Sequence, residues 1–337
     1  MPNILRLIPP VGYRVIQNYF RLREYSRYPY CYPLPLRYRF THTFAFSLVK
    51  PFRIRFVFHG LKNAGDDRAL FVFNHQSDFD PPAIMAMLYR PCGYLAKKVI
   101  STFPIINHIV SATDGDYLDR YDIRQEVRTI RGISQKLKND PEMGYVIFPE
   151  GKRSQDPYFR TMSEYKPGSL KAAYNAKADI VPVALYGTYR LLEFGKRDFK
   201  VYPVQVTFLP RIKYEDYKGL STVELSKKIQ ALTEAEVDRM RHLQAALESY
   251  WNQPEQVREF RRDVSKRMKE YFSRRRKEAR ADRKLARASL KEHPRKDPFI
   301  PVTYTKVDKK HDAESKRERA QEKAEFIRRF KEAHRGI

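Results

Sequence analysis

The stretch FVFNHQSDFDPP, Phe71 to Pro82, changes abruptly from apolar to polar residues and ends in two prolines. Its short apolar part is typical of a buried strand that enters a polar loop. Pro81 suits the first position of a helix, which makes Asp80 a candidate N-cap, and the apolar run PPAIMAMLYR continues that helix. The stretch therefore predicts a strand, a loop that contains His75, and a helix.

The residues on both sides of this stretch repeat the alternation of strand and helix. Short apolar or alternating runs predict strands at Arg53–Phe58, Leu70–Phe73, Tyr145–Phe148, Ile180–Leu185 and Val204–Leu209. Amphipathic patterns at 123–137 and 169–177 predict helices between them. This order indicates an α/β fold, in which a mostly parallel β-sheet is covered by helices on both faces.

The α/β domain is predicted at 46–215, and the segment before it, 1–45, is basic and aromatic. Val11 to Leu22 has the periodicity of a helix with basic residues over an apolar face, which suits a membrane interface and equally a surface helix packed on its own domain. The following run SRYPYCYPLPLRYRF contains three prolines. We do not expect a regular helix there.

The segments after the α/β domain are predicted to be helical. In 216–250, Ser221 and Glu224 form a plausible capping box before a packing helix. From Trp251 to the end, 28 Lys and Arg residues face 15 Asp and Glu residues, so this tail carries half of the excess charge. Because few apolar residues remain, we expect 251–337 to be a charged helical extension or partly disordered.

The composition limits the classes of partner and compartment. The 337 residues include 66 Lys and Arg against 40 Asp and Glu, a net charge of +26 that attracts nucleic acid, anionic membranes or acidic proteins. Two distant cysteines, Cys31 and Cys92, form neither a disulfide framework nor a zinc motif, so an intracellular protein is expected. We find no secretory signal, and no apolar run approaches the length of about 18 residues that a spanning helix needs.

In open α/β sheets, ligands bind beyond the carboxyl ends of the strands. The cluster NHQSDFD follows Phe73 at such an end, with His75 and Asp80 five residues apart. On a continuous helix these two would diverge by about 140°, so they can meet only if His75 lies in the loop before the helix. Asp80 could then accept a hydrogen bond from one ring nitrogen and leave the other free to take a proton. A simple Asx turn is the alternative for this cluster alone.

A second cluster, PEGKRS, follows Phe148. Glu150 and Gly151 end the strand, and Lys152 and Arg153 place two cations beside Ser154. Glycine lets the backbone turn tightly, and the planar guanidinium of arginine fits phosphate oxygens. The cluster predicts either a phosphate-binding turn or a basic surface turn.

Taken together, the two clusters resemble a known family. NHQSDFD is similar to the NHxxxxD motif of the glycerol-phosphate and lysophosphatidate acyltransferases, and FPEGKRS is similar to the family's FPEGTRS block, with Lys152 in place of threonine. YLDR, which ends at Arg120, and YKPGSLKAA with IVPVAL, which contains Pro182, follow in the family's order. The resemblance covers residues 53–185 and none of the flanking segments.

The resemblance implies transfer of a fatty acyl group from acyl-CoA or acyl carrier protein to a hydroxyl of lysophosphatidate, which gives phosphatidate. Glycerol-3-phosphate or another lysophospholipid is the alternative acceptor. A basic nucleic-acid-binding protein that uses the cationic tail is the alternative from another class.

The resemblance also implies roles for individual residues. It makes His75 the general base and Asp80 its orienting partner, in a direct transfer with no acyl-enzyme. The candidates for holding the acceptor phosphate are Arg120, Lys152 and Arg153. The candidates for shaping the pocket are Asn74, Glu150, Gly151, Ser154 and Pro182, with Lys166 as a further candidate.

The implied reaction needs no metal and no cofactor besides the acyl donor. Its lipid acceptor lies in a bilayer, and no spanning helix is predicted. We therefore expect a peripheral protein at the cytoplasmic face of a membrane, where the Val11–Leu22 helix supplies apolar contact and the basic tail supplies electrostatic attraction.

Overall fold

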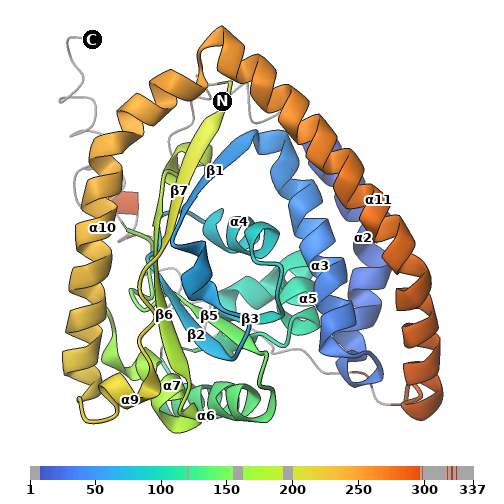
Figure 1. The fold of residues 1–337 in the computed structure, drawn as a ribbon. Coiled ribbons are helices and arrows are strands. Elements are labelled where there is room, and N and C mark those ends of the chain that lie inside the picture. Colours follow the sequence, from blue (N-terminus) through green and yellow to red (C-terminus); the bar gives the residue numbers. More distant parts are fainter. Residues whose placement is uncertain are drawn as a thin grey trace.

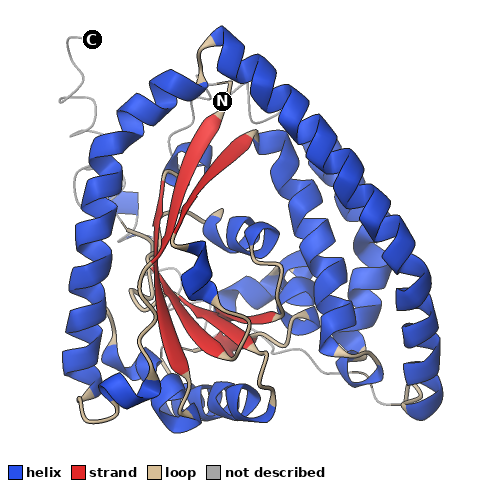
Figure 2. Cartoon of the chain, in the orientation of Figure 1, coloured by secondary structure: helices blue, strands red, loops and turns tan. Residues whose placement is uncertain are grey.

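The computed structural model describes residues 8–119, 121–154, 162–192 and 200–296, together with 298, 317, 320, 321 and 324. These residues form a seven-stranded sheet with helices on both of its faces (Figures 1 and 2). The strands are β1 (Ile54–His59), β2 (Ala69–Phe73), β3 (Cys92–Lys97), β4 (Asp116–Leu118), β5 (Gly144–Ile147), β6 (Asp179–Tyr186) and β7 (Tyr202–Phe208). The α-helices are α2 (Ile8–Arg27), α3 (Leu34–Val49), α4 (Asp80–Met87), α5 (Pro104–Ala112), α6 (Ile123–Asn139), α7 (Lys171–Ala176), α8 (Tyr189–Leu192), α9 (Tyr214–Tyr217), α10 (Thr222–Trp251) and α11 (Pro254–Glu292).

The strand order is β1-β7-β6-β2-β5-β3-β4, and only the pair β6–β7 is antiparallel. The prediction of a mostly parallel sheet is therefore confirmed. The sequence missed β3 and β4, because Cys92–Lys97 is only partly apolar and Asp116–Leu118 is too short to show a pattern. β2 lies between β5 and β6, so the loop after β2 opens near the middle of the sheet edge.

The two faces of β2 belong to two separate cores. Phe71 and Phe73 pack in the cluster that α3 and α4 cover, whereas Leu70 and Val72 pack in the cluster that α6, α7 and α10 cover. All four side chains are fully buried, as expected when successive residues of a strand point to opposite covered faces. This burial explains why Leu70–Phe73 is continuously apolar rather than alternating.

The proline-rich segment is more regular than the sequence suggested. The prediction that residues 26–40 form no regular helix is wrong for their second half, because α3 begins at Leu34. Pro35 lies in the first turn, where the backbone N–H groups have no partner within the helix, so proline costs nothing there. The predicted helix at Val11–Leu22 is confirmed as part of α2, which packs against α5.

The C-terminal part contains two long helices. The capping box of Ser221 and Glu224 is present at the start of α10, as predicted. After a short turn, α11 runs back along the outer side of α3 and α2 (Figure 1). The predicted helical extension is thus confirmed for its described part. The predicted division into four segments stays a prediction, and α3 continues through the boundary placed at residue 45.

Candidate functional site

The carboxyl ends of β2 and β5, two neighbouring parallel strands, bring the two polar clusters together. His75 lies in the loop between β2 and α4, and Glu150 lies in the turn after β5. The parallel pairing requires both loops to leave the same edge of the sheet. The structure therefore joins two motifs that are about 75 residues apart in the sequence.

His75 and Asp80 form the pair that the sequence predicted. The distance from Nδ1 of His75 to Oδ2 of Asp80 is 2.8 Å, and the His75 side chain is 15% exposed while that of Asp80 is fully buried. A carboxylate can only accept, so Nδ1–H donates to Asp80 and Nε2 carries the lone pair. This tautomer is the one that a general base requires.

The capping role predicted for Asp80 is corrected by the structure. Phe79 is the N-cap of α4, and Asp80 is the first helical residue. Its Oδ2 also accepts hydrogen bonds from the backbone N–H groups of Gln76 and Ser77, at 2.7 and 3.0 Å, so the carboxylate turns back toward the loop. One oxygen of Asp80 thereby holds both the ring of His75 and the backbone that follows it.

The second motif holds the backbone and the ring of His75 from the other side. The N–H of His75 donates to Oε1 of Glu150 at 2.7 Å, and the carbonyl of His75 accepts from the N–H of Ser154 at 2.6 Å. The imidazole stacks on the ring of Phe148, with centroids 4.3 Å apart. Backbone and ring are therefore fixed independently, which is what a precisely placed base needs.

Glu150 is enclosed and faces backbone donors. It is 2% exposed, and its Oε2 accepts from the N–H of Ser163 at 2.8 Å. Burial raises the pKa of this carboxyl from 4.5 to about 8, although the hydrogen bonds from Ser163 and His75 act in the opposite direction. Glu150 thus links the loop that contains His75 to the segment that contains Ser163.

Two cations lie next to this base on the turn after β5. Arg153 forms an ion pair with Asp78 at 3.0 Å, and Lys152 precedes it at a half-buried position. Through this pair, Asp78 links the two motifs, a contact that the sequence did not indicate. Arg120, the third predicted phosphate-binding residue, lies outside the described residues.

The structure adds a cation that the sequence reasoning missed. Lys98 follows β3 and forms an ion pair with Asp119, just after β4, at 3.0 Å. Both residues lie at the same sheet edge as His75, because β3 and β4 are parallel to β2. The sequence shows two adjacent lysines, Lys97 and Lys98. Their position at a strand end was missed because β3 was not predicted.

The other predicted pocket residues lie on separate segments of the chain. Asn74 is fully buried and bonds the backbone of Leu185 in both directions, at 2.9 and 2.7 Å. Gly151 has φ of 66°, a conformation that favours glycine. Pro182 lies inside β6 opposite Val72, three residues before the level of His75. Lys166 is exposed and its N–H donates to the carbonyl of Pro149.

The assembled geometry places a histidine base beside cations at one edge of the sheet. This arrangement can take a proton from a hydroxyl whose molecule also carries a phosphate. Within the described parts of the chain, no group of three or more His, Cys, Asp or Glu side chains is placed to hold a metal ion.

Comparisons with known proteins point to the same chemistry. Residues 55–186 match the family model "Acyltransferase". A probable 1-acyl-sn-glycerol-3-phosphate acyltransferase of Mycoplasma genitalium is 25% identical over 252 residues, which cover 68% of this chain and 91% of that protein. A 1-acyl-sn-glycerol-3-phosphate acyltransferase of Chlamydomonas reinhardtii is 30% identical over 144 residues, which cover 43% of this chain and 41% of that one.

A solved structure extends the similarity to the fold. The crystal structure of the 1-acyl-sn-glycerophosphate acyltransferase PlsC from Thermotoga maritima superposes with a TM-score of 0.51 at 25% identity, and covers 60% of this chain and 79% of that chain. Motifs, sheet topology and these similarities agree, and residues 55–186 of this chain match the acyltransferase family.

Proposed function

We propose that this enzyme transfers a fatty acyl group from a thioester to the free hydroxyl of 1-acylglycerol-3-phosphate and so forms phosphatidate. The observation that carries this proposal is the pairing of His75 with Asp80 beside Arg153 and Lys152 at one sheet edge. The names of the relatives support the acceptor, and they leave the acyl donor open between acyl-CoA and acyl carrier protein.

The chemical step follows from the tautomer of His75. Nε2 takes the proton of the acceptor hydroxyl as its oxygen attacks the thioester carbonyl, and Asp80 stabilises the imidazolium that forms. The tetrahedral intermediate then expels the thiolate, which receives the same proton from the imidazolium. No covalent acyl-enzyme is required, because the acceptor oxygen itself is the nucleophile.

The acceptor phosphate is held by the cations on the turn after β5. The Asp78–Arg153 pair is partly exposed to solvent, so it contributes about 0–1 kcal/mol and a phosphate dianion can displace Asp78. Lys152 adds a second cation, and Lys98 follows β3 at the same edge of the sheet. Arg120 remains a candidate that the family resemblance implies. We assign the phosphate to these residues and the reacting hydroxyl to His75.

The proposal is tested with purified protein, a labelled acyl donor and a panel of acceptors. We expect a higher kcat/KM with 1-acylglycerol-3-phosphate than with glycerol-3-phosphate or lysophosphatidylcholine. Rapid-quench experiments should show no burst of acyl-enzyme. Turnover of glycerol-3-phosphate alone would move the assignment to the alternative acceptor. A covalent acyl-enzyme would refute direct transfer.

Replacing Arg153 with alanine is expected to raise the acceptor KM about 10- to 100-fold and to change kcat little, because a charge-assisted hydrogen bond to phosphate contributes about 1.5–3 kcal/mol. Steady-state kinetics with the acceptor varied measure both constants. Arg128→Ala, an exposed arginine on α6, is the matched control. An unchanged KM with reduced kcat would remove Arg153 from the phosphate site.

Glu150→Gln is expected to lower kcat about 10- to 100-fold with little change in acceptor KM, because an amide can accept only one of the two buried N–H donors and an unpaired one costs about 1–3 kcal/mol. This decrease in kcat is expected because His75 would be positioned less precisely, not because Glu150 contacts the acceptor. Steady-state kinetics separate the two constants. A rise in acceptor KM alone would show that Glu150 touches the acceptor instead.

The same variant has a signature in stability. The pKa of Glu150 is raised from 4.5 to about 8 on folding. The folded state therefore holds a proton that the unfolded state releases, so the wild type loses stability as the pH rises from about 4.5 to about 8. Glu150→Gln should remove this component, whereas Glu164→Gln, an exposed neighbour, should keep it. Unfolding curves at several pH values provide the measurement.

We also propose that α2 docks the enzyme on a bilayer surface. Tyr13, Ile16 and Phe20 form an apolar ridge along α2 and are 57%, 72% and 78% exposed. Phe103 and Ile106, at the start of the adjoining α5, are exposed as well. No described helix combines the length and the apolar character needed to cross a bilayer. Exposed apolar side chains beside arginines are typical of an interfacial helix.

A further inference from the structure

Most cations of α11 are exposed, whereas three of its acids are half-buried. The acids Asp263, Glu278 and Asp282 are half-buried, whereas 14 of the helix's 15 Lys and Arg residues are exposed. Asp282 pairs with Arg39 of α3 at 2.6 Å, and Asp263 pairs with Arg55 of β1 at 2.8 Å. Asp263 and Asp282 therefore help to hold α11 on the protein, whereas most of its cations face solvent.

In the C-terminal half of α11, all the exposed charged side chains of one stretch are cations. The stretch 271–291 lies wholly within the described residues and has no exposed acid. Its exposed cations are Arg274, Arg276, Lys277, Arg280, Arg283, Lys284, Arg287 and Lys291. At 1.5 Å per residue these cations line a face about 25 Å long. We call this face of 271–291 the cationic face.

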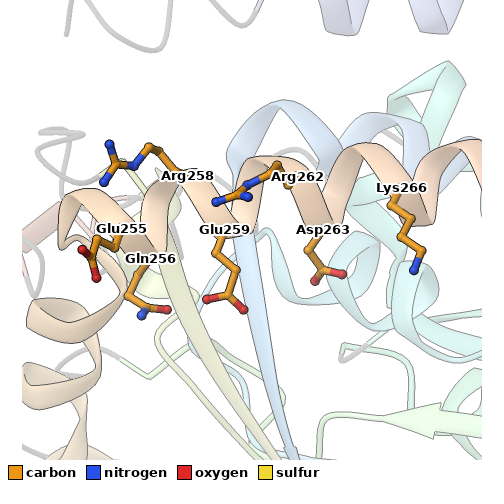
Figure 3. Close-up of a pocket in the computed structure, with 7 residues that line it drawn as sticks. All are labelled: Glu255, Gln256, Arg258, Glu259, Arg262, Asp263 and Lys266. Carbon is orange, nitrogen blue, oxygen red and sulfur yellow. The ribbon is translucent and has the colours of Figure 1, made fainter.

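The N-terminal half of α11 is different and provides an internal comparison. A hollow beside it is lined by side chains of both signs, which include Glu255, Arg258, Glu259, Arg262, Asp263 and Lys266 (Figure 3). None of its lining residues belongs to the two motifs around His75. Mixed charges of this kind give a weak local field, so attraction of an anionic surface is concentrated on the cationic face.

The surroundings of the cationic face favour a lipid surface as its partner. Within 271–291 itself, Leu285 is the exposed large apolar residue and both aromatic rings are half-buried. The exposed ring of Tyr89 nearby is covered by the guanidinium of Arg274, so little aromatic surface is left to stack on nucleobases. The end of α11 packs on the segment after α2, where Ser289 donates to the carbonyl of Cys31 at 2.7 Å. Tyr30, in the same segment, is exposed. The end of the helix that carries the cationic face therefore lies against the segment that follows α2, the helix with the apolar ridge.

We infer that the cationic face of α11 binds the headgroups of anionic lipids, at a surface separate from the catalytic site. The inference rests on the proposed function for its membrane setting, and its binding step requires no turnover. Apolar contact by α2 and electrostatic contact by α11 would then act as two independent signals for membrane association. The consequence is a membrane affinity that depends on the anionic lipid content.

The test uses the full-length protein and sedimentation with vesicles of phosphatidylcholine, alone or with phosphatidylglycerol. Arg276, Arg280, Arg283 and Arg287 form one exposed stripe of the cationic face, and among the described residues none of them has a hydrogen bond or an ion pair. Replacing all four with Gln is expected to weaken binding to anionic vesicles about tenfold or more, because each cation near an anionic surface contributes independently. Binding to neutral vesicles should not change.

A matched variant removes the same charge elsewhere on the helix. Arg258, Arg262, Lys266 and Lys269 lie in the half with exposed acids, and their replacement by Gln should weaken binding less than about threefold. Ile16→Asp with Phe20→Asp should weaken binding to both kinds of vesicle. Far-UV circular dichroism confirms that each variant is folded. Equal losses in the two four-residue variants would refute a localised site.

Two further outcomes separate this inference from its alternatives. Wild-type binding to a structured RNA that the stripe variant loses, without any loss on anionic vesicles, would overturn the lipid assignment in favour of nucleic acid. Turnover of a short-chain acceptor in detergent should be normal in the stripe variant. Normal turnover without charge-dependent binding would refute the inference alone, whereas charge-dependent binding without turnover would refute the proposed function alone.

Discussion

His75→Ala is expected to lower kcat by about 10²–10⁴-fold, the range that a general base contributes. Nε2 of His75 is the proton acceptor in the proposed step, and its ring is held by Asp80 on one side and by Phe148 on the other. Alanine removes the ring and leaves the backbone bonds to Glu150 and Ser154 in place, so the loop should keep its course. Initial rates at saturating acceptor measure the effect.

Two comparisons make this result specific. The acceptor KM of His75→Ala should stay within about threefold of the wild-type value, because the phosphate is held by other residues. His242→Ala, whose side chain is 72% exposed on α10, should turn over normally. A His75→Ala enzyme with near-normal kcat and an intact circular dichroism spectrum would remove His75 as the base.

Asp80→Asn is expected to lower kcat about 10²–10³-fold, through loss of charge rather than loss of shape. Oδ2 of Asp80 accepts from Nδ1 of His75 and from the N–H groups of Gln76 and Ser77, and an asparagine oxygen can occupy the same place. The variant no longer has a negative charge facing the imidazolium, an interaction of about 4 kcal/mol at an effective dielectric constant of about 20. Rates at saturating acceptor report this loss.

The stability of the Asp80 variants distinguishes charge from geometry. Oδ1 of Asp80 is buried and no hydrogen-bond partner is found for it in the described structure, so the asparagine amide replaces one unpaired group with another and the melting temperature should change little. Asp80→Ala leaves buried N–H groups without an acceptor and should lose about 1–3 kcal/mol of stability for each. Asp66→Asn, in an exposed turn, is the control. Near-normal turnover of Asp80→Asn would refute the electrostatic role.

Much of the fold and of the candidate site could be predicted, because the sequence patterns that indicate them extend over only a few residues. Leu70–Phe73 is continuously apolar since both faces of β2 are covered, and the two prolines after Asp80 allow a helix to start there. The spacing of His75 and Asp80 required a loop followed by a helix, and the 2.8 Å contact confirms that geometry. The capping box at Ser221 is equally local, because its donors and acceptors are three residues apart.

Other features were predicted wrongly or not at all from the sequence, for reasons that the structure makes clear. The prolines of 26–40 suggested an irregular segment, but proline is harmless in a first turn and α3 forms behind it. Asp78 looked like a loop residue because Arg153, its partner, is 75 positions away. β4 has three residues and is stabilised by pairing with β3, so its own composition carries little information.

Local sequence patterns were enough to predict the α/β class, the strand ends that carry the motifs, and the pairing of His75 with Asp80. Tertiary structure decided what Glu150 touches, how Asp78 links the motifs, and which side of α11 faces solvent. The physical reason is the range of the interactions. Periodicity and capping act within a few residues, whereas the bonds from Glu150 to His75 and from Asp282 to Arg39 close loops of 75 and 243 residues. Such contacts exist only once the sheet has aligned its strands and α10 has turned α11 back onto α3.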